Sequence, residues 1–205
     1  MPARVALAIG ALALTLAASV TAKDDDHRFA VHSSTFQNNG TLPLITIDTY
    51  PPGGPNSCTV DGTPGGNESP EVSWSHAPED TVSFVVVMYD VTASFTHWAM
   101  FNIPASTHML PLNAGVSGSA YGEQVSNDFG DLSYDGPCPP PTLAPTTHEY
   151  VVTVYALNVR LNVPAHGAFP PGAEALYHAL LDAAQHDHIL ARASIRGLYS
   201  TAPGL

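Results

Sequence analysis

The segment Val82–Tyr89 reads VSFVVVMY, and Asp90 follows it directly. Strands that are buried on both faces appear in a sequence as unbroken apolar runs, so this run predicts a buried strand that ends at a carboxylate. Two further apolar runs each begin directly after a histidine: Trp98–Ile103 (WAMFNI) after His97, and Tyr150–Leu157 (YVVTVYAL) after His148.

The ionisable residues at the ends of these runs predict a small polar site. If the first two runs pair as antiparallel neighbours, their short connection places Asp90 and His97 at the same edge of the sheet. The third run brings His148 to a strand end as well. One carboxylate and one or two imidazoles above an apolar floor are typical of a ligand pocket.

Two kinds of chemistry fit this set of residues. A carboxylate with two imidazoles can bind a divalent metal, although the spacing gives no close pair of histidines. Alternatively, protonated His97 and His148 can donate to phosphate or carboxylate oxygens, and Asp90 would then orient an imidazole. In that case anion affinity should rise as the pH is lowered from about 8 to 6. The residues alone leave both interpretations open.

The first residues of the chain resemble a secretory leader. Met1–Arg4 carries one positive charge, Val5–Leu16 is apolar, and Val20–Ala22 offers small residues for cleavage. We therefore predict a signal peptide at 1–22, a single domain at 23–205, and a periplasmic or secreted location. The apolar stretch is shorter than the roughly 20 residues of a membrane span, so we expect no stable membrane insertion.

The composition narrows the function classes. With 18 acidic and 6 basic residues the formal charge is −12, which argues against nucleic acid as a partner. No nucleophile elbow and no glycine-rich nucleotide motif is present, so we expect neither an enzyme nor a cofactor. Cys58 and Cys138 can form one disulfide in an exported chain, or they can be two unrelated buried thiols.

The remainder of the chain favours an all-β core with long loops and one helix. Proline-rich stretches at Pro43–Pro70 and Gly136–Pro145 predict irregular loops. Ala173–Gln185 predicts a helix, and Ile195–Tyr199 predicts a last strand. The apolar stripe expected on this helix consists of Leu176, Leu180, Leu181 and Ala184.

Several short motifs occur in the same order as the motifs of one known protein family. Asp90 falls on the first Asp of a D-P-D-x-P motif, and Phe95-Thr96-His97-Trp98 with Asn102-Ile103-Pro104 resembles an H-W…N-I-P strand. The other matching segments are Gly66–Pro70 with Val72–Trp74, Asn127–Gly130, Tyr134–Pro140, His148–Tyr150 with Tyr155–Leu157, and His188–Ala191 with Gly197–Tyr199. Together these segments resemble the phosphatidylethanolamine-binding protein family, in its bacterial Raf kinase inhibitor-like branch.

This resemblance implies a mainly β, two-sheet antiparallel fold with a C-terminal helix. It also implies a pocket for a phosphate-like anion or a phospholipid head group, and a possible protein partner such as a kinase or a protease. The pocket residues implied by position are Asp90, Phe95, His97, Gly136, Pro137, His148 and Tyr150.

The chain departs from the family motifs at two places. Val91, Thr92 and Ser94 stand where D-P-D-x-P has Pro, Asp and Pro, and Glu149 stands where H-R-Y has Arg. We expect an exported, non-enzymatic binding protein with an anion pocket and no metal. Two alternatives are a metal-dependent enzyme, such as a hydrolase, that uses Asp90 and the two histidines, and an inhibitor that acts through its surface loops while the pocket is vestigial.

Overall fold

The computed structural model describes residues 27–165 and 170–202. The predicted signal peptide, residues 1–22, lies outside the described residues. Within them, no helix is long and apolar enough to cross a membrane.

Residues 27–165 and 170–202 form two β-sheets, and the larger one has six strands in the order β2-β9-β8-β4-β5-β7. Each pair of neighbours is antiparallel except β2 and β9, which are parallel. The strands are β2 (Gly40–Thr41), β4 (Ser83–Asp90), β5 (Phe95–Pro104), β7 (Glu123–Gln124), β8 (Thr147–Leu157) and β9 (Ile189–Ser200).

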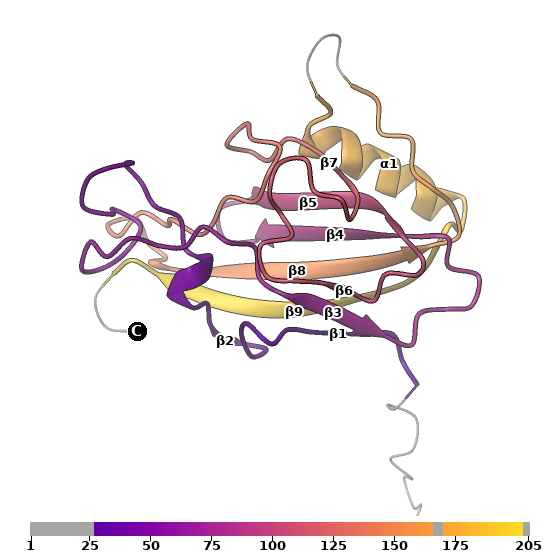
Figure 1. Cartoon of the computed structure of the whole chain (residues 1–205), viewed down its shortest axis with the longest axis horizontal. Helices are drawn as coiled ribbons and strands as arrows, with labels where there is room; N and C mark the ends of the chain where they lie inside the picture. Colours follow the sequence, from indigo (N-terminus) through magenta and orange to yellow (C-terminus); the bar gives the residue numbers. More distant parts are fainter. Residues whose placement is uncertain (1–26, 166–169, 203–205) are drawn as a thin grey trace, which may run out of the picture.

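The smaller sheet and the α-helix that the structure describes cover opposite faces of the large sheet. The small antiparallel sheet has the order β1-β3-β6 and consists of β1 (Ala30–His32), β3 (Val72–Ser75) and β6 (Met109–Leu110). Its Trp74 packs in one core with Phe84 and Val86 of β4. Helix α1 (Ala173–Gln185) packs in a second core with Val85 and Val87. In Figure 1, α1 lies beyond β5 at the top of the view, and the small sheet lies near β9 at the bottom.

The three apolar runs form the centre of the large sheet. β4 pairs with β5 on one side and with β8 on the other, so the condition under which Asp90 and His97 share one edge, antiparallel pairing of the first two runs, is met. β4 and β5 are buried on both faces, as predicted. β8 is different, because its residues alternate between buried and half-buried. The face of β8 that lies on the helix side of the sheet is therefore only partly covered.

The helix has the predicted bounds, but its buried stripe is different. The buried residues are Ala173, Leu176, Leu180 and Ala183. Leu181 is 56% exposed and Ala184 is exposed, so the prediction for these two residues was wrong. A spacing of three, four and three residues keeps one face of a helix against the sheet, and Leu181 lies one residue round from that face.

The last strand is longer than predicted. β9 begins at Ile189 instead of Ile195, and it pairs with β8 along the whole length of that strand. The predicted loop at Pro43–Pro70 is irregular apart from a short 3-10 helix, η1 (Leu44–Thr46).

Candidate functional site

A cavity of about 250 Å³ lies at the edge of the large sheet where β4 ends and where β5 and β8 begin. The sheet register places Asp90 opposite both Phe95 and Tyr150, which explains why side chains from three strands meet there. The lining residues are Asp90, Ala93, Phe95, His97, Phe129, Cys138, Pro139, Pro140, His148 and Tyr150. Five of the seven residues that the sequence implied therefore lie around one cavity.

Asp90 and His148 form a buried pair at the base of this pocket. His148 Nδ1 donates to Asp90 Oδ2 at 2.6 Å, and the two side chains are 9% and 3% exposed. The other carboxylate oxygen of Asp90 accepts from the backbone N–H groups of Thr92 and Ala93 at 2.8 and 3.0 Å. Because Nδ1 is engaged by the carboxylate, Nε2 is the nitrogen of His148 that can meet a ligand.

His97 is held from a different direction. Its Nδ1 lies 2.7 Å from the carbonyl oxygen of Asp135, to which it donates, so Nε2 again remains for a ligand. Burial lowers the pKa of this imidazole from its ordinary value of 6.5, and the contact with Asp135 and the charge of Asp90 counter that shift only in part. At neutral pH His97 is therefore uncharged.

The Tyr150 hydroxyl is a buried polar atom in the same pocket. It makes no hydrogen bond of good geometry among the described residues, and the carboxylate of Asp90 is its polar neighbour. Burial, followed by the charge of Asp90, raises the pKa of this hydroxyl, so it is a neutral donor at any physiological pH. A buried hydroxyl without a partner costs about 1–3 kcal/mol, and a ligand oxygen at this position would remove that cost.

Phe129, which is not among the pocket residues expected from the sequence, covers one side of the pocket. Its ring centre lies 4.6 Å from that of Phe95, and the side chain is 52% exposed. The loop that carries Phe129 is fixed by Asn127, whose Oδ1 accepts from the backbone N–H groups of residues 129, 130 and 131 at 3.0–3.1 Å. Asn127 Nδ2 also donates to Asp135 Oδ2 at 2.7 Å, which joins this loop to the segment that holds His97.

Gly136 and Pro137 do not belong to the lining residues. The backbone of Gly136 packs against the end of η1 and the two residues that follow it, and an added Cβ would lie 2.3 Å from the carbonyl oxygen of Thr46. Pro137 contributes its carbonyl oxygen to the N–H of Asp48 at 3.3 Å. The glycine is therefore required by contact with the chain itself, and Cys138, Pro139 and Pro140 form the wall of the pocket instead.

Replacing Gly136 should consequently destabilise the fold. Gly136→Ala forces the Thr46 carbonyl away, and we expect a loss of about 1–3 kcal/mol in the free energy of unfolding. Gly54→Ala is the matched control, because its Cβ would meet only a proline ring carbon at 3.5 Å. Urea unfolding of both variants measures the difference, and equal midpoints would contradict the close packing.

A disulfide bond connects the pocket wall to the Pro- and Gly-rich loop. Cys58 and Cys138 are bonded with an S–S distance of 2.01 Å. The sequence left open a disulfide or two separate thiols, and the structure has the disulfide. Cys58 is buried, and Cys138 faces the pocket. The hydroxyl of Thr201 donates to the Pro139 carbonyl and holds the next residue of the same wall.

The charge reversal at Glu149 lies outside the pocket. Tyr150 and His148 point into the pocket, and Glu149 between them faces the other side of β8. Its carboxylate pairs there with Arg196 at 3.0 Å. The pocket itself has neither lysine nor arginine in its lining. Any positive charge in it must therefore come from the histidines.

The described residues contain no group of three or more His, Cys, Asp and Glu side chains that is arranged to hold a metal ion. Asp90 and His148 are in contact, but His97 is directed to the Asp135 carbonyl.

Comparison with known proteins identifies the fold. The family model described as phosphatidylethanolamine-binding protein matches residues 32–200. The UPF0098 protein of Aquifex aeolicus is 38% identical over 176 residues, which are 82% of this chain and 86% of the relative. The UPF0098 protein YbhB of Escherichia coli is 36% identical over 147 residues, 68% of this chain and 85% of the relative.

A solved structure agrees. The crystal structure of E. coli YbcL, described as a new member of the mammalian PEBP family, superposes with a TM-score of 0.65 at 29% identity. The match covers 84% of this chain and 98% of that one. The family match over most of the chain, the curated relatives and the shared two-sheet architecture lead to one conclusion: this chain belongs to the phosphatidylethanolamine-binding protein family.

Proposed function

We propose that this chain is an exported binding protein whose strand-end pocket takes a small phosphate-like anion, either free or as the head group of a phospholipid. The observation that carries the proposal is the buried Tyr150 hydroxyl without a partner, which lines the same cavity as His97 and His148. Each histidine uses Nδ1 for a protein acceptor. Once the imidazoles are protonated, two Nε2–H groups and one hydroxyl can donate to the oxygens of one anion.

The surroundings of these donors suit a small head group. Phe95, Phe129 and the prolines form apolar walls, and the cavity of about 250 Å³ is below the size of most drug-like sites. The export part of the proposal is supported by the disulfide bond, because such bonds persist mainly in oxidising compartments.

Anion binding at this pocket should be coupled to proton uptake. Burial lowers the pKa of His97 below 6.5, so the empty pocket holds this imidazole neutral at pH 7. An anion favours the protonated form, and affinity should therefore increase as the pH falls below 6.5, a lower window than the one expected from sequence. Sulfate is a suitable probe, because phosphate monoesters themselves titrate near pH 6.

Calorimetry with sulfate between about pH 7.5 and pH 5.5 measures this dependence. We expect His97→Ala to weaken sulfate binding at the acidic end by about 1.5–3 kcal/mol, the range for a hydrogen bond to a charged group. His178→Ala is the matched control, since this histidine lies on α1 and is 73% exposed. Affinity that is flat with pH, or equally weak in both variants, would reject the pocket as an anion site.

A protein partner such as a kinase or a protease is a second candidate. The observation that favours it is the exposure of apolar side chains near the pocket mouth: Phe129 is 52% exposed, and Leu143, three residues after Pro140, is 63% exposed. Exposed apolar residues on loops are common anchors of protein interfaces. Leu143→Ser should abolish inhibition of such a partner without changing sulfate affinity, whereas a loss of both would assign the effect to the pocket.

A further inference from the structure

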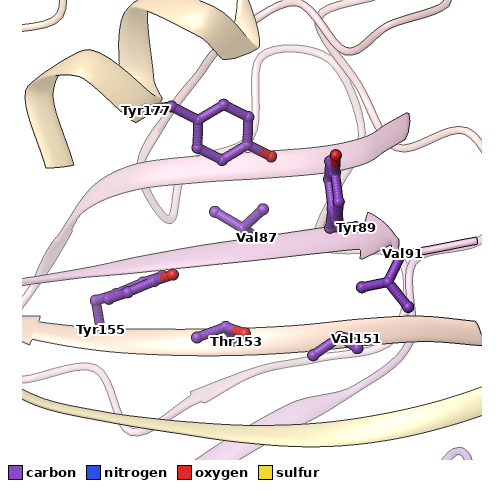
Figure 2. A pocket seen from close by; sticks show the side chains of 7 residues that line it. All are labelled: Val87, Tyr89, Val91, Val151, Thr153, Tyr155 and Tyr177. Carbon is purple, nitrogen blue, oxygen red and sulfur yellow. The ribbon is translucent and has the colours of Figure 1, made fainter. Parts of the chain in front are cut away.

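A second hollow, of about 350 Å³, lies on the opposite face of the same two strands (Figure 2). Its position follows from strand alternation: Asp90 and Tyr150 point into the first pocket, while Tyr89, Val91 and Val151 point into the second. The lining residues are Val87, Tyr89 and Val91 at β4, Val151, Thr153 and Tyr155 on β8, and Tyr177 on α1. We call this hollow the outer groove.

The outer groove has an apolar floor and aromatic walls. Val87 is buried in the floor, and in Figure 2 Tyr177 comes from the helix while Tyr155 stands on β8 at the other side. The rings of Tyr89 and Tyr177 meet edge to face with centres 6.2 Å apart. The hydroxyls of Tyr177 and Thr96 are 2.9 Å apart, so this wall is fixed before any ligand binds.

The groove exists because α1 covers only part of the sheet. The helix packs on the outward residues of β4 and β5, while those of β8 remain half-buried. An apolar floor left open beside an ordered aromatic wall is typical of a ligand site.

The two ends of the groove carry opposite charge. β9 runs beside β8, seen in yellow at the bottom of Figure 2, and Arg192 pairs in register with Tyr155. The contact of 2.8 Å between the hydroxyls of Thr153 and Ser194 shows that the outward residues of β8 and β9 share this face. At the other end, a neighbouring hollow that shares Tyr89 and Tyr177 is lined by Asp128 and by Glu174, which lies 3.6 Å from His178 in the same lining.

Arg192 is the positive charge at this site that remains for a ligand. Arg160 pairs with Glu123 at 3.1 Å, and Arg196, which lies in register with Val151, pairs with Glu149 at 3.0 Å. Arg192 is exposed and makes no ion pair within residues 27–165 and 170–202. In a chain of formal charge −12, an arginine without a carboxylate partner beside an aromatic groove indicates an anionic ligand group.

We infer that the outer groove binds an organic carboxylate with a flat aromatic or short aliphatic body. The body lies on Val87 and Val151 between the tyrosine rings, and the carboxylate faces the Arg192 guanidinium, which can donate two parallel hydrogen bonds. The carboxylate of Asp128 at the other end repels the ligand carboxylate and so fixes the orientation. The volume of about 350 Å³ accommodates one fused ring system or a short acyl chain.

Two probes with the same apolar body test the charge preference. Calorimetry of the whole mature chain is done with 2-naphthoate and with 2-naphthylmethylammonium. We expect the carboxylate to bind more tightly than the ammonium. Arg192→Gln should weaken binding of the carboxylate about 5- to 10-fold and should not weaken binding of the ammonium. Arg160→Gln is the matched control, because Arg160 is exposed and lies outside the groove.

A second variant locates the binding. Thr153→Trp places a large ring on the half-exposed floor and should abolish naphthoate binding while sulfate affinity stays unchanged. Saturating sulfate should not displace naphthoate, because the two pockets lie on opposite faces of the sheet.

Tighter binding of the ammonium would assign the groove to a cation held by the tyrosine rings and would overturn the inference. Equal naphthoate affinity in wild type and Arg192→Gln, or displacement by sulfate, would overturn it as well. The anion pocket is judged separately, by the sulfate data on His97→Ala.

Discussion

Asp90→Ala is expected to lower the free energy of unfolding by about 3–5 kcal/mol, because each donor left without its acceptor costs about 1–3 kcal/mol. Asp90 is 2% exposed and accepts from His148 as well as from two backbone N–H groups. Its loss leaves all three donors without their acceptor. Urea unfolding at pH 7, followed by circular dichroism, measures the change.

Asp80→Ala is the matched control for this variant, because Asp80 is exposed in the turn before β4. We expect its midpoint to remain within experimental error of the wild type. A loss below about 1 kcal/mol in Asp90→Ala would mean that the pair with His148 is not part of the folded core.

Breaking the Cys58–Cys138 bond should lower the free energy of unfolding by about 2–4 kcal/mol. The bond joins residues 80 positions apart, so it removes many conformations from the unfolded chain. The double variant Cys58→Ser/Cys138→Ser should reproduce the effect of reduction in the wild-type chain. Denaturant unfolding with and without reductant provides both measurements.

The control for this experiment is internal, because reductant should leave the double variant unchanged. An oxidised protein that unfolds at the same urea concentration as the reduced one would contradict the expectation. Sulfate affinity should also fall when the bond is absent, because Cys138 lines the pocket and this wall loses its attachment to Cys58.

The sequence predicted the core strands and the helix because their signals are local. The runs at β4 and β5 are apolar on both faces, and the apolar spacing of Ala173–Gln185 is that of a helix. The meeting of Asp90, His97 and His148 followed from strand ends alone. The resemblance added Phe95 and Tyr150, which also line the pocket.

Other features depend on contacts between distant segments. Phe129 is positioned by the Asn127 side chain and by packing on Phe95, and no local pattern marks it as a pocket residue. Gly136 belongs to a family motif, but the reason for the glycine is the carbonyl of Thr46, far away in the sequence. The run YVVTVYAL suggests burial on both faces, yet α1 leaves the outer side of β8 half open. That difference is the origin of the outer groove.

Binding of an anion by two histidines and a tyrosine is tested most directly by a crystal structure of residues 23–205 grown at about pH 5.5 with phosphoethanolamine. We predict phosphate oxygens within hydrogen-bonding distance of Nε2 of His97, Nε2 of His148 and the Tyr150 hydroxyl, and no phosphate in crystals of His97→Ala at the same concentration. A phosphate group bound elsewhere, or a wild-type pocket that holds none, would contradict the account.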